Sequence, residues 1–123
     1  MLDNTQKAVK GGILQLLWHQ AYEVPFNVSL SLYQLGRDYL VVAAGGDAHI
    51  GAVAFDGQVN VLSPHKEGPL ALELQQQLAG IIGGSVAVVA GIHYPGLQPD
   101  QIKQVVDLVT QLAGSLKRDF PSL

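Results

Sequence analysis

Residues 26–62 contain the sequence FNVSLSLYQLGRDYLVVAAGGDAHIGAVAFDGQVNVL, in which strand-like segments alternate with turn signals. Apolar and polar side chains alternate with period two from Phe26 to Leu35, as expected for a strand with one buried face. Asp56-Gly57 favours a type I′ hairpin, because both central positions of that turn need positive φ angles. We therefore predict a four-stranded antiparallel meander from the segments 26–35, 39–44, 49–55 and 58–62.

The chain changes to helical periodicity after this meander. One predicted helix ends at Gly83-Gly84, and its apolar face comprises Leu70, Leu74, Leu78, Ile81 and Ile82. Residues 85–92 are almost entirely apolar, which is typical of a strand buried on both faces. A final helix is predicted to start near Pro99, and its apolar face comprises Ile102, Val105, Val106, Val109, Leu112, Ala113 and Leu116. The predicted fold is an α+β two-layer sandwich with the element order β-β-β-β-α-β-α.

The length of 123 residues predicts one domain spanning 1–123. Residues 1–22 give the least definite pattern. Their apolar positions from Ile13 to Trp18 are compatible with a short helix, although Gly11-Gly12 weakens its start. No repeat, linker or low-complexity tract indicates a second domain.

The composition excludes several classes of partner. A net charge of -3 with scattered cations does not provide the basic face that nonspecific nucleic-acid binding requires. No apolar run is long enough to cross a membrane. Because the sequence has no cysteine and no secretory signal, we expect a cytoplasmic protein. Charged residues make up only 14%, well below the usual quarter, so we expect unusually apolar surface and a homodimer or a protein partner that covers it.

Three polar segments interrupt the apolar chain between residues 38 and 98: Gly45-Gly46-Asp47-Ala48-His49-Ile50-Gly51, Pro64-His65-Lys66-Glu67-Gly68 and Gly91-Ile92-His93-Tyr94-Pro95. The predicted order of strands and helices places all three at one end of the sheet. Both helices are expected to begin there, near Pro69 and Pro99, and helix N-termini offer unpaired N–H groups and partial positive charge. Lys66 is the only cation between Arg37 and Lys103. We therefore expect a site for a phosphate or carboxylate ligand at this end.

Each residue of these segments also has a structural explanation. Asp47 after a glycine pair is typical of a turn. Asp47 and His49 are expected to share a strand face, so the pair suits a metal ion or proton exchange, with a structural hydrogen bond as the alternative. Glu67 near a helix start gains about 0.3–1 kcal/mol from the helix dipole, and His93 at the end of a buried strand is usually structural. The argument for a site therefore depends on the concentration of these residues.

The first two segments and Gly91-Ile92-His93 of the third resemble motifs of the LpdD-like family, the small D component associated with gallate-type decarboxylases. The resemblance extends over roughly residues 28–116, and Tyr94-Pro95 depart from the more polar residues expected there. This resemblance implies an accessory protein or chaperone, rather than an enzyme, that binds prenylated FMN or FMN and works with a UbiD-like decarboxylase and a flavin prenyltransferase. In that case Lys66 and the helix starts would meet the flavin phosphate, while His49, His65 and His93 would line the ring or its approach. The candidate cofactor-binding residues are Gly45, Gly46, Asp47, His49, His65, Lys66, Glu67 and His93, and no catalytic residue can be transferred from the family.

Two alternatives remain open at this stage. As a divalent-metal-dependent hydrolase, the chain would use Asp47, His49, His65 and His93 to hold zinc or a similar ion that activates water. As a purely structural decarboxylase-associated subunit, it would dock a partner through its weakly charged surface. The sequence has no nucleophile beside a base and no phosphate loop of the G-x-x-x-x-G-K type, so it gives no support to a nucleophilic hydrolase or an NTPase.

Overall fold

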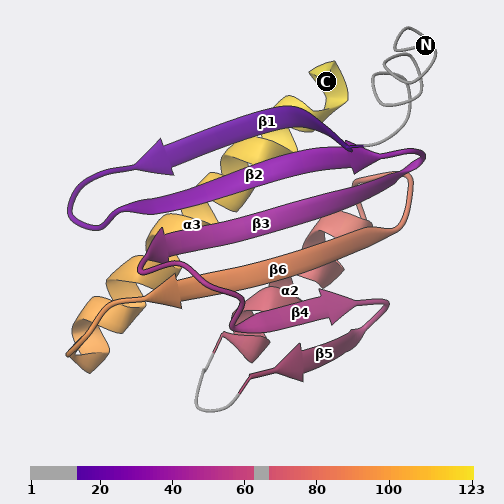
Figure 1. Ribbon diagram of the computed structural model, residues 1–123. Coiled ribbons are helices and arrows are strands. Elements are labelled where there is room, and N and C mark those ends of the chain that lie inside the picture. Colours follow the sequence, from indigo (N-terminus) through magenta and orange to yellow (C-terminus); the bar gives the residue numbers. More distant parts are fainter. Residues whose placement is uncertain (1–13, 63–66) are drawn as a thin grey trace, which may run out of the picture.

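The strands form one six-stranded mixed sheet with the order β1-β2-β3-β6-β4-β5. The computed structural model describes residues 14–62 and 67–123. Its elements are β1 (Leu14–Tyr22), β2 (Val28–Leu35), β3 (Asp38–Gly46), β4 (Ala52–Phe55), β5 (Gln58–Val61), α2 (Gly68–Ala79), β6 (Val86–His93), α3 (Pro99–Asp119) and the 3-10 turn η1 (Phe120–Ser122). Figure 1 shows α2 and α3 behind the sheet, so one sheet face is covered, and no helix of the described residues lies on the other face. The predicted α+β two-layer architecture is therefore confirmed.

The four predicted meander strands exist, but they do not form a continuous meander. The β2–β3 and β4–β5 hairpins are antiparallel as predicted. Between them lies β6, which pairs in parallel with β3 and antiparallel with β4. An apolar strand suits the centre of a sheet better than its edge, and this placement requires the chain to cross β6 between β3 and β4. The prediction that this strand is buried on both faces was wrong, because Val86, Val88 and Ala90 are buried toward the helices whereas Ala87 and Val89 on the other face are partly exposed. The third strand consequently begins at Ala52 and not at His49.

The N-terminal segment forms a strand and no helix from Leu14 onward. β1 pairs antiparallel with β2, with a register irregularity between Leu16 and Trp18. The indole of Trp18 is buried, and its Nε1 donates to Asp119 Oδ2 over 2.9 Å, tying β1 to the end of α3. Pairing along the whole of β2 and burial of the indole outweigh the local helical pattern.

The turn prediction and the start of the last helix agree with the structure. The predicted end of the first helix was wrong, because α2 ends at Ala79 and Ile81 beyond it is 41% exposed. Asp56 and Gly57 have φ angles of 53° and 76°, the two positive values of a type I′ turn. α3 begins at Pro99, and the side chains and backbones of Gln98 and Gln101 form a reciprocal capping box. Ile102 and Val106 are 49% and 36% exposed, so the predicted apolar face of this helix was too wide.

The covered face carries the hydrophobic core. Its strand residues with 0% exposure are Val28, Leu30, Leu32, Val41, Ala43, Ala54, Val88 and Ala90. α3 contributes Val109 and Leu116 at 0% exposure, and α2 contributes Ala71. No helix within residues 14–62 and 67–123 combines the length and apolar character needed to cross a bilayer.

No helix or strand of residues 14–62 and 67–123 covers the opposite face, and we call it the open face. Residues paired across neighbouring strands point to the same side of the sheet, so the strand register identifies the residues of the open face. Its apolar members are Leu14, Leu16, Ala21, Tyr33, Leu35, Leu40, Val42, Ala44, Val53, Phe55, Ala87 and Val89. Leu14, Leu16, Leu35 and Phe55 are 51%, 54%, 52% and 51% exposed.

Candidate functional site

The connection from β3 to β4, residues 47–51, crosses β6 at Gly91, and we call it the crossover loop. Gly91 pairs with Ala44, so a side chain at this position would point to the open face. A Cβ on Gly91 would overlap the main-chain oxygen of His49 and lie 2.5 Å from its carbonyl carbon. The absence of a side chain at Gly91 therefore permits the chain to pass over β6.

Main-chain hydrogen bonds attach both ends of the crossover loop to β6. The N–H of Asp47 donates to the oxygen of His93, and the N–H of Gly51 donates to the oxygen of Ala90, each over 2.9 Å. Gly46, which precedes the loop, has a φ angle of +61° and packs so closely on His93 that no side chain fits there. The loop therefore forms a fixed rim at the end of the open face.

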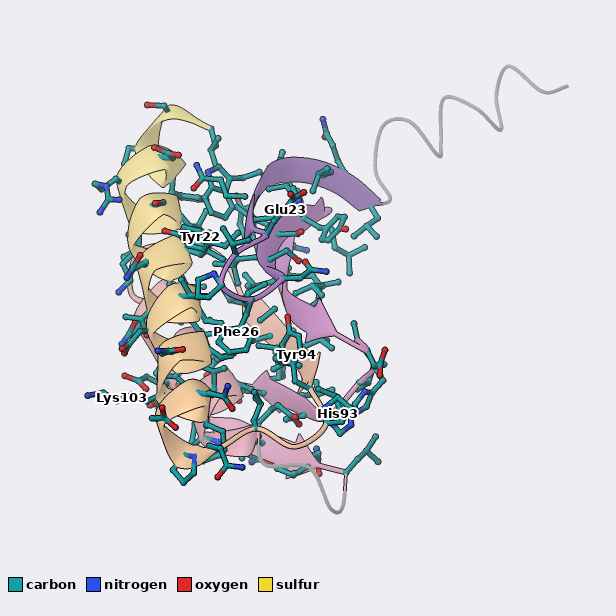
Figure 2. The ribbon with its side chains drawn as sticks, turned by 90° about the vertical axis from the view of Figure 1, so that its left-hand side faces the viewer. Tyr22, Glu23, Phe26, His93, Tyr94 and Lys103 are labelled. Atoms are coloured by element: carbon teal, nitrogen blue, oxygen red, sulfur yellow. The ribbon has the colours of Figure 1, made fainter. Side chains whose placement is uncertain are left out.

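Two histidines meet on this rim. The rings of His49 and His93 are in edge-to-face contact, with centroids 5.8 Å apart and planes at 67°. Both side chains are exposed, and Figure 2 shows His93 on the side of the sheet opposite α3. His49 Nδ1 lies 2.9 Å from the main-chain oxygen of Asp47. A carbonyl oxygen only accepts, so Nδ1 carries the proton and Nε2 is the acceptor of the neutral ring.

Tyr94 supports the rim from the covered side. Its hydroxyl donates to the main-chain oxygen of Asn27, and its ring packs edge-to-face on Phe26 with centroids 5.4 Å apart. Figure 2 shows Phe26 between α3 and Tyr94. Burial raises the pKa of Tyr94 above its usual value of 10.0, so the hydroxyl remains protonated at neutral pH. These contacts fix the backbone that follows His93.

Glu67, which immediately precedes α2, reaches the crossover loop from the helix layer. Its carboxyl group fills the side-chain space that Gly51 leaves, because a Cβ on Gly51 would lie 2.7 Å from Glu67 Cδ. Within the described part of the chain, Glu67 Oε2 is buried without a hydrogen-bond partner. A buried carboxylate oxygen is unfavourable without a donor or a proton, so Glu67 offers an acceptor beneath the rim.

The structure brings together most of the sequence-predicted site residues. Asp47, His49, Glu67 and His93 gather at the end of β3 and β6, where Gly46 pairs with His93, so the predicted clustering of the first and third polar segments is confirmed. His65 and Lys66 lie outside the described residues. Asp47 and His49 lie in a loop, so the expectation that they share a strand face was wrong. Gly45 lies on the covered face, and a Cβ there would lie 2.7 Å from the oxygen of Asn27, so its role is packing.

Sequence reasoning missed the open face and the polar contact within it. His19 Nδ1 lies 2.7 Å from Ser31 Oγ, and both residues belong to the open face. The period-two alternation of β2 places Ser29 and Ser31 opposite the core, but the sequence does not show that no helix covers them. In residues 14–62 and 67–123, no three His, Cys, Asp or Glu side chains are grouped to hold a metal ion.

Comparison with protein families identifies the group to which this arrangement belongs. Residues 22–120 match the model described as prenylated flavin chaperone LpdD-like domain. The chain belongs to this LpdD-like family. The match covers β2 to α3 and therefore includes the crossover loop and both histidines of the rim. The family is one of prenylated flavin chaperones, which associates the chain with a flavin and a flavin-dependent partner enzyme. No curated protein matches the sequence.

Proposed function

We propose that this chain binds prenylated FMN, or FMN, at the His49–His93 end of the open face and carries it to a UbiD-like decarboxylase. The observation that supports this most strongly is the pair of exposed imidazoles in edge-to-face contact beside a helix-free apolar sheet face. The family match adds the chemical class of the ligand.

The residues present suit a flavin ring. Isoalloxazine is planar and apolar over most of its area, with carbonyl and ring-nitrogen groups along one edge. Ala44 on β3 and Ala87 and Val89 on β6 are small or β-branched residues of the open face, and they would give an apolar surface for the ring. The imidazoles of His49 and His93 stand at its end, where hydrogen bonds to a polar ring edge are possible. Ligand sites usually combine an apolar lining with a few such polar groups.

The phosphate would be held by Lys66 and by the helix N-termini. Lys66 lies outside the described residues, and its role follows from its position as the only cation between Arg37 and Lys103. α2 and α3 both begin at the end of the sheet that carries His93, although in the helix layer. A helix N-terminus favours an anion by its free N–H groups and its dipole. The α2 N-terminus, which has no side-chain cap, suits the phosphate better than the α3 N-terminus, where Gln98 already caps the first turn.

A carrier needs to bind, orient and shield its cargo. The flavin supplies the decarboxylation chemistry once it is in the partner enzyme. The open face would exclude water from one side of the ring, and the two imidazoles would orient its polar edge. Neither task requires a nucleophile, in agreement with a sequence in which we identify none.

Fluorescence titration with FMN tests the site. We expect His93→Ala to weaken FMN binding by about 3–30-fold, because a ring contact and a hydrogen bond are lost. His19→Ala is the matched control, since His19 lies on the same face but on β1, three strands from β6. Equal effects of the two substitutions, or no FMN binding by the wild type, would refute the location.

Delivery requires a separate experiment. Co-expression with the cognate decarboxylase and prenyltransferase should raise the fraction of decarboxylase that contains prenylated flavin, measured by bound-cofactor absorbance and activity. His93→Ala should reduce this gain, whereas His19→Ala should not. Identical loading with and without the chain would contradict the carrier role.

A further inference from the structure

We propose that the open face is the interface with a second copy of this chain, packed sheet against sheet. Apolar side chains extend across five of its six strands, from Leu16 at 54% exposure on β1 to Phe55 at 51% on β4. Isolated exposed apolar side chains are normal on a protein surface, but a continuous apolar patch of this extent marks an interaction site.

The face is large enough for a stable dimer. β1, β2, β3 and β6 have eight or nine residues each, and β4 and β5 have four. At about 3.3 Å per residue and 4.8 Å between strands, the sheet covers about 650 Å² in projection. A side-chain surface has more accessible area than its projection, and a standard interface buries about 800 Å² per partner. One copy therefore offers the area that a specific dimer requires.

The chemistry of the face favours an identical partner. Asp38, at the corner where β3 begins, is the only Asp, Glu, Lys or Arg among its described strand positions, and Asp38 Oδ1 already accepts from the N–H of Ser85. The face consequently carries little charge with which to select a different protein or to repel its own copy. Two copies of one twisted sheet have the same twist, and such sheets pack face to face at about −30° and 10 Å apart. Two-fold symmetry pairs the same patch with itself.

This inference does not depend on flavin binding, because the apolar face is a property of the chain alone. Sedimentation of the ligand-free protein tests it. We expect wild type to sediment at twice the chain mass of 13.1 kDa. Val42→Lys should raise the dimer dissociation constant at least about 30-fold, since it buries an unpaired charge at the centre of the interface.

Matched variants separate this effect from misfolding. Val106→Lys makes the same substitution on the exposed side of α3 and should leave the dimer intact. Leu16→Lys, at a position 54% exposed, should weaken dimerisation while preserving the circular dichroism and the melting transition of a folded chain.

Because the chain has no cysteine, single spin labels can then locate the interface. Labels at Val42→Cys should lie within about 20 Å of each other across two sheets, and labels at Gln104→Cys on α3 should be about 40 Å apart, with two helix layers between them.

Three results would overturn the proposal. The first is a wild-type chain that remains monomeric at all accessible concentrations, which would assign the face to a different protein. The second is a dimer that neither Val42→Lys nor Leu16→Lys weakens. The third is a shorter label separation at Gln104 than at Val42, which would place the interface on the helix layer.

Discussion

Gly91→Ala should uncouple the crossover loop from the sheet. The new methyl carbon would overlap the main-chain oxygen of His49 and lie 2.5 Å from its carbonyl carbon, whereas ordinary contacts begin at 3.4 Å. The loop would therefore have to retreat by about 1 Å or more, because atoms in van der Waals contact cannot approach that closely. Such a shift weakens the main-chain hydrogen bonds from Asp47 to His93 and from Gly51 to Ala90, both 2.9 Å long.

The expected loss of unfolding free energy follows from these contacts. Two weakened hydrogen bonds contribute about 0.5–1.5 kcal/mol each, and overpacking adds about 1–3 kcal/mol. The sum, about 2–6 kcal/mol, is a large part of the 5–15 kcal/mol that a domain typically has. Urea unfolding followed by circular dichroism measures it, and FMN titration of the folded variant should show weaker binding because His49 moves away from His93.

Gly83→Ala is the control, because a Cβ on Gly83 meets nothing within 4 Å. The alanine side chain restricts the backbone mainly in the unfolded chain. This substitution should therefore leave the folded state equally stable or stabilise it by up to about 1 kcal/mol. A Gly91→Ala variant as stable as Gly83→Ala would show that the loop does not cross β6 at this position.

Three further predictions concern the ligand and the rim. Lys66→Ala should weaken FMN binding by about 10–150-fold, the equivalent of one charge-assisted contact, and should leave riboflavin, which has no phosphate, unaffected; equal losses for both ligands would contradict a phosphate role. Burial raises the pKa of Tyr94 above 10.0, so the stability from its neutral hydroxyl is present at neutral pH and is lost as pH rises through that pKa. Tyr94→Phe should therefore cost about 0.5–1.5 kcal/mol at pH 7, and thermal melts should show this difference narrowing above pH 10. Zinc added to the dialysed chain should leave its melting temperature unchanged; a rise that His49→Ala abolishes would favour the metal alternative, because a bound ion stabilises by linkage.

The sequence was most informative where local chemistry determines structure. Asp56-Gly57 adopts two positive φ angles as predicted, and Pro99 begins its helix. The period-two pattern correctly assigns Val28, Leu30 and Leu32 to the buried face, although Ser31 on the other face is also only 8% exposed. The order in which strands lie side by side in the sheet is not determined by local sequence. Periodicity shows which side chains share a face but not which strands are neighbours, so the insertion of β6 between β3 and β4 could not be read from it.

The candidate site was predictable to the same extent. Strand directions placed His93 and Asp47 at one end of the sheet, and the structure joins them by a main-chain hydrogen bond of 2.9 Å. The contact between His49 and His93 depends on the path of the crossover loop over Gly91, which local patterns do not encode. The same is true of the contacts of Tyr94 with Phe26 and Asn27, which join residues far apart in the sequence.

The two proposals use one surface, so the flavin and the second copy must influence each other. If the ring lies between two copies, FMN tightens dimerisation; if the ring and the partner compete for the open face, FMN weakens it. Reciprocity requires that the factor by which FMN changes the dimer dissociation constant equal the factor by which dimerisation changes the affinity for FMN. Sedimentation at increasing FMN concentration therefore distinguishes a cofactor enclosed by the dimer from one that separates it, and in the second case the carrier would release its cargo by re-forming its own interface.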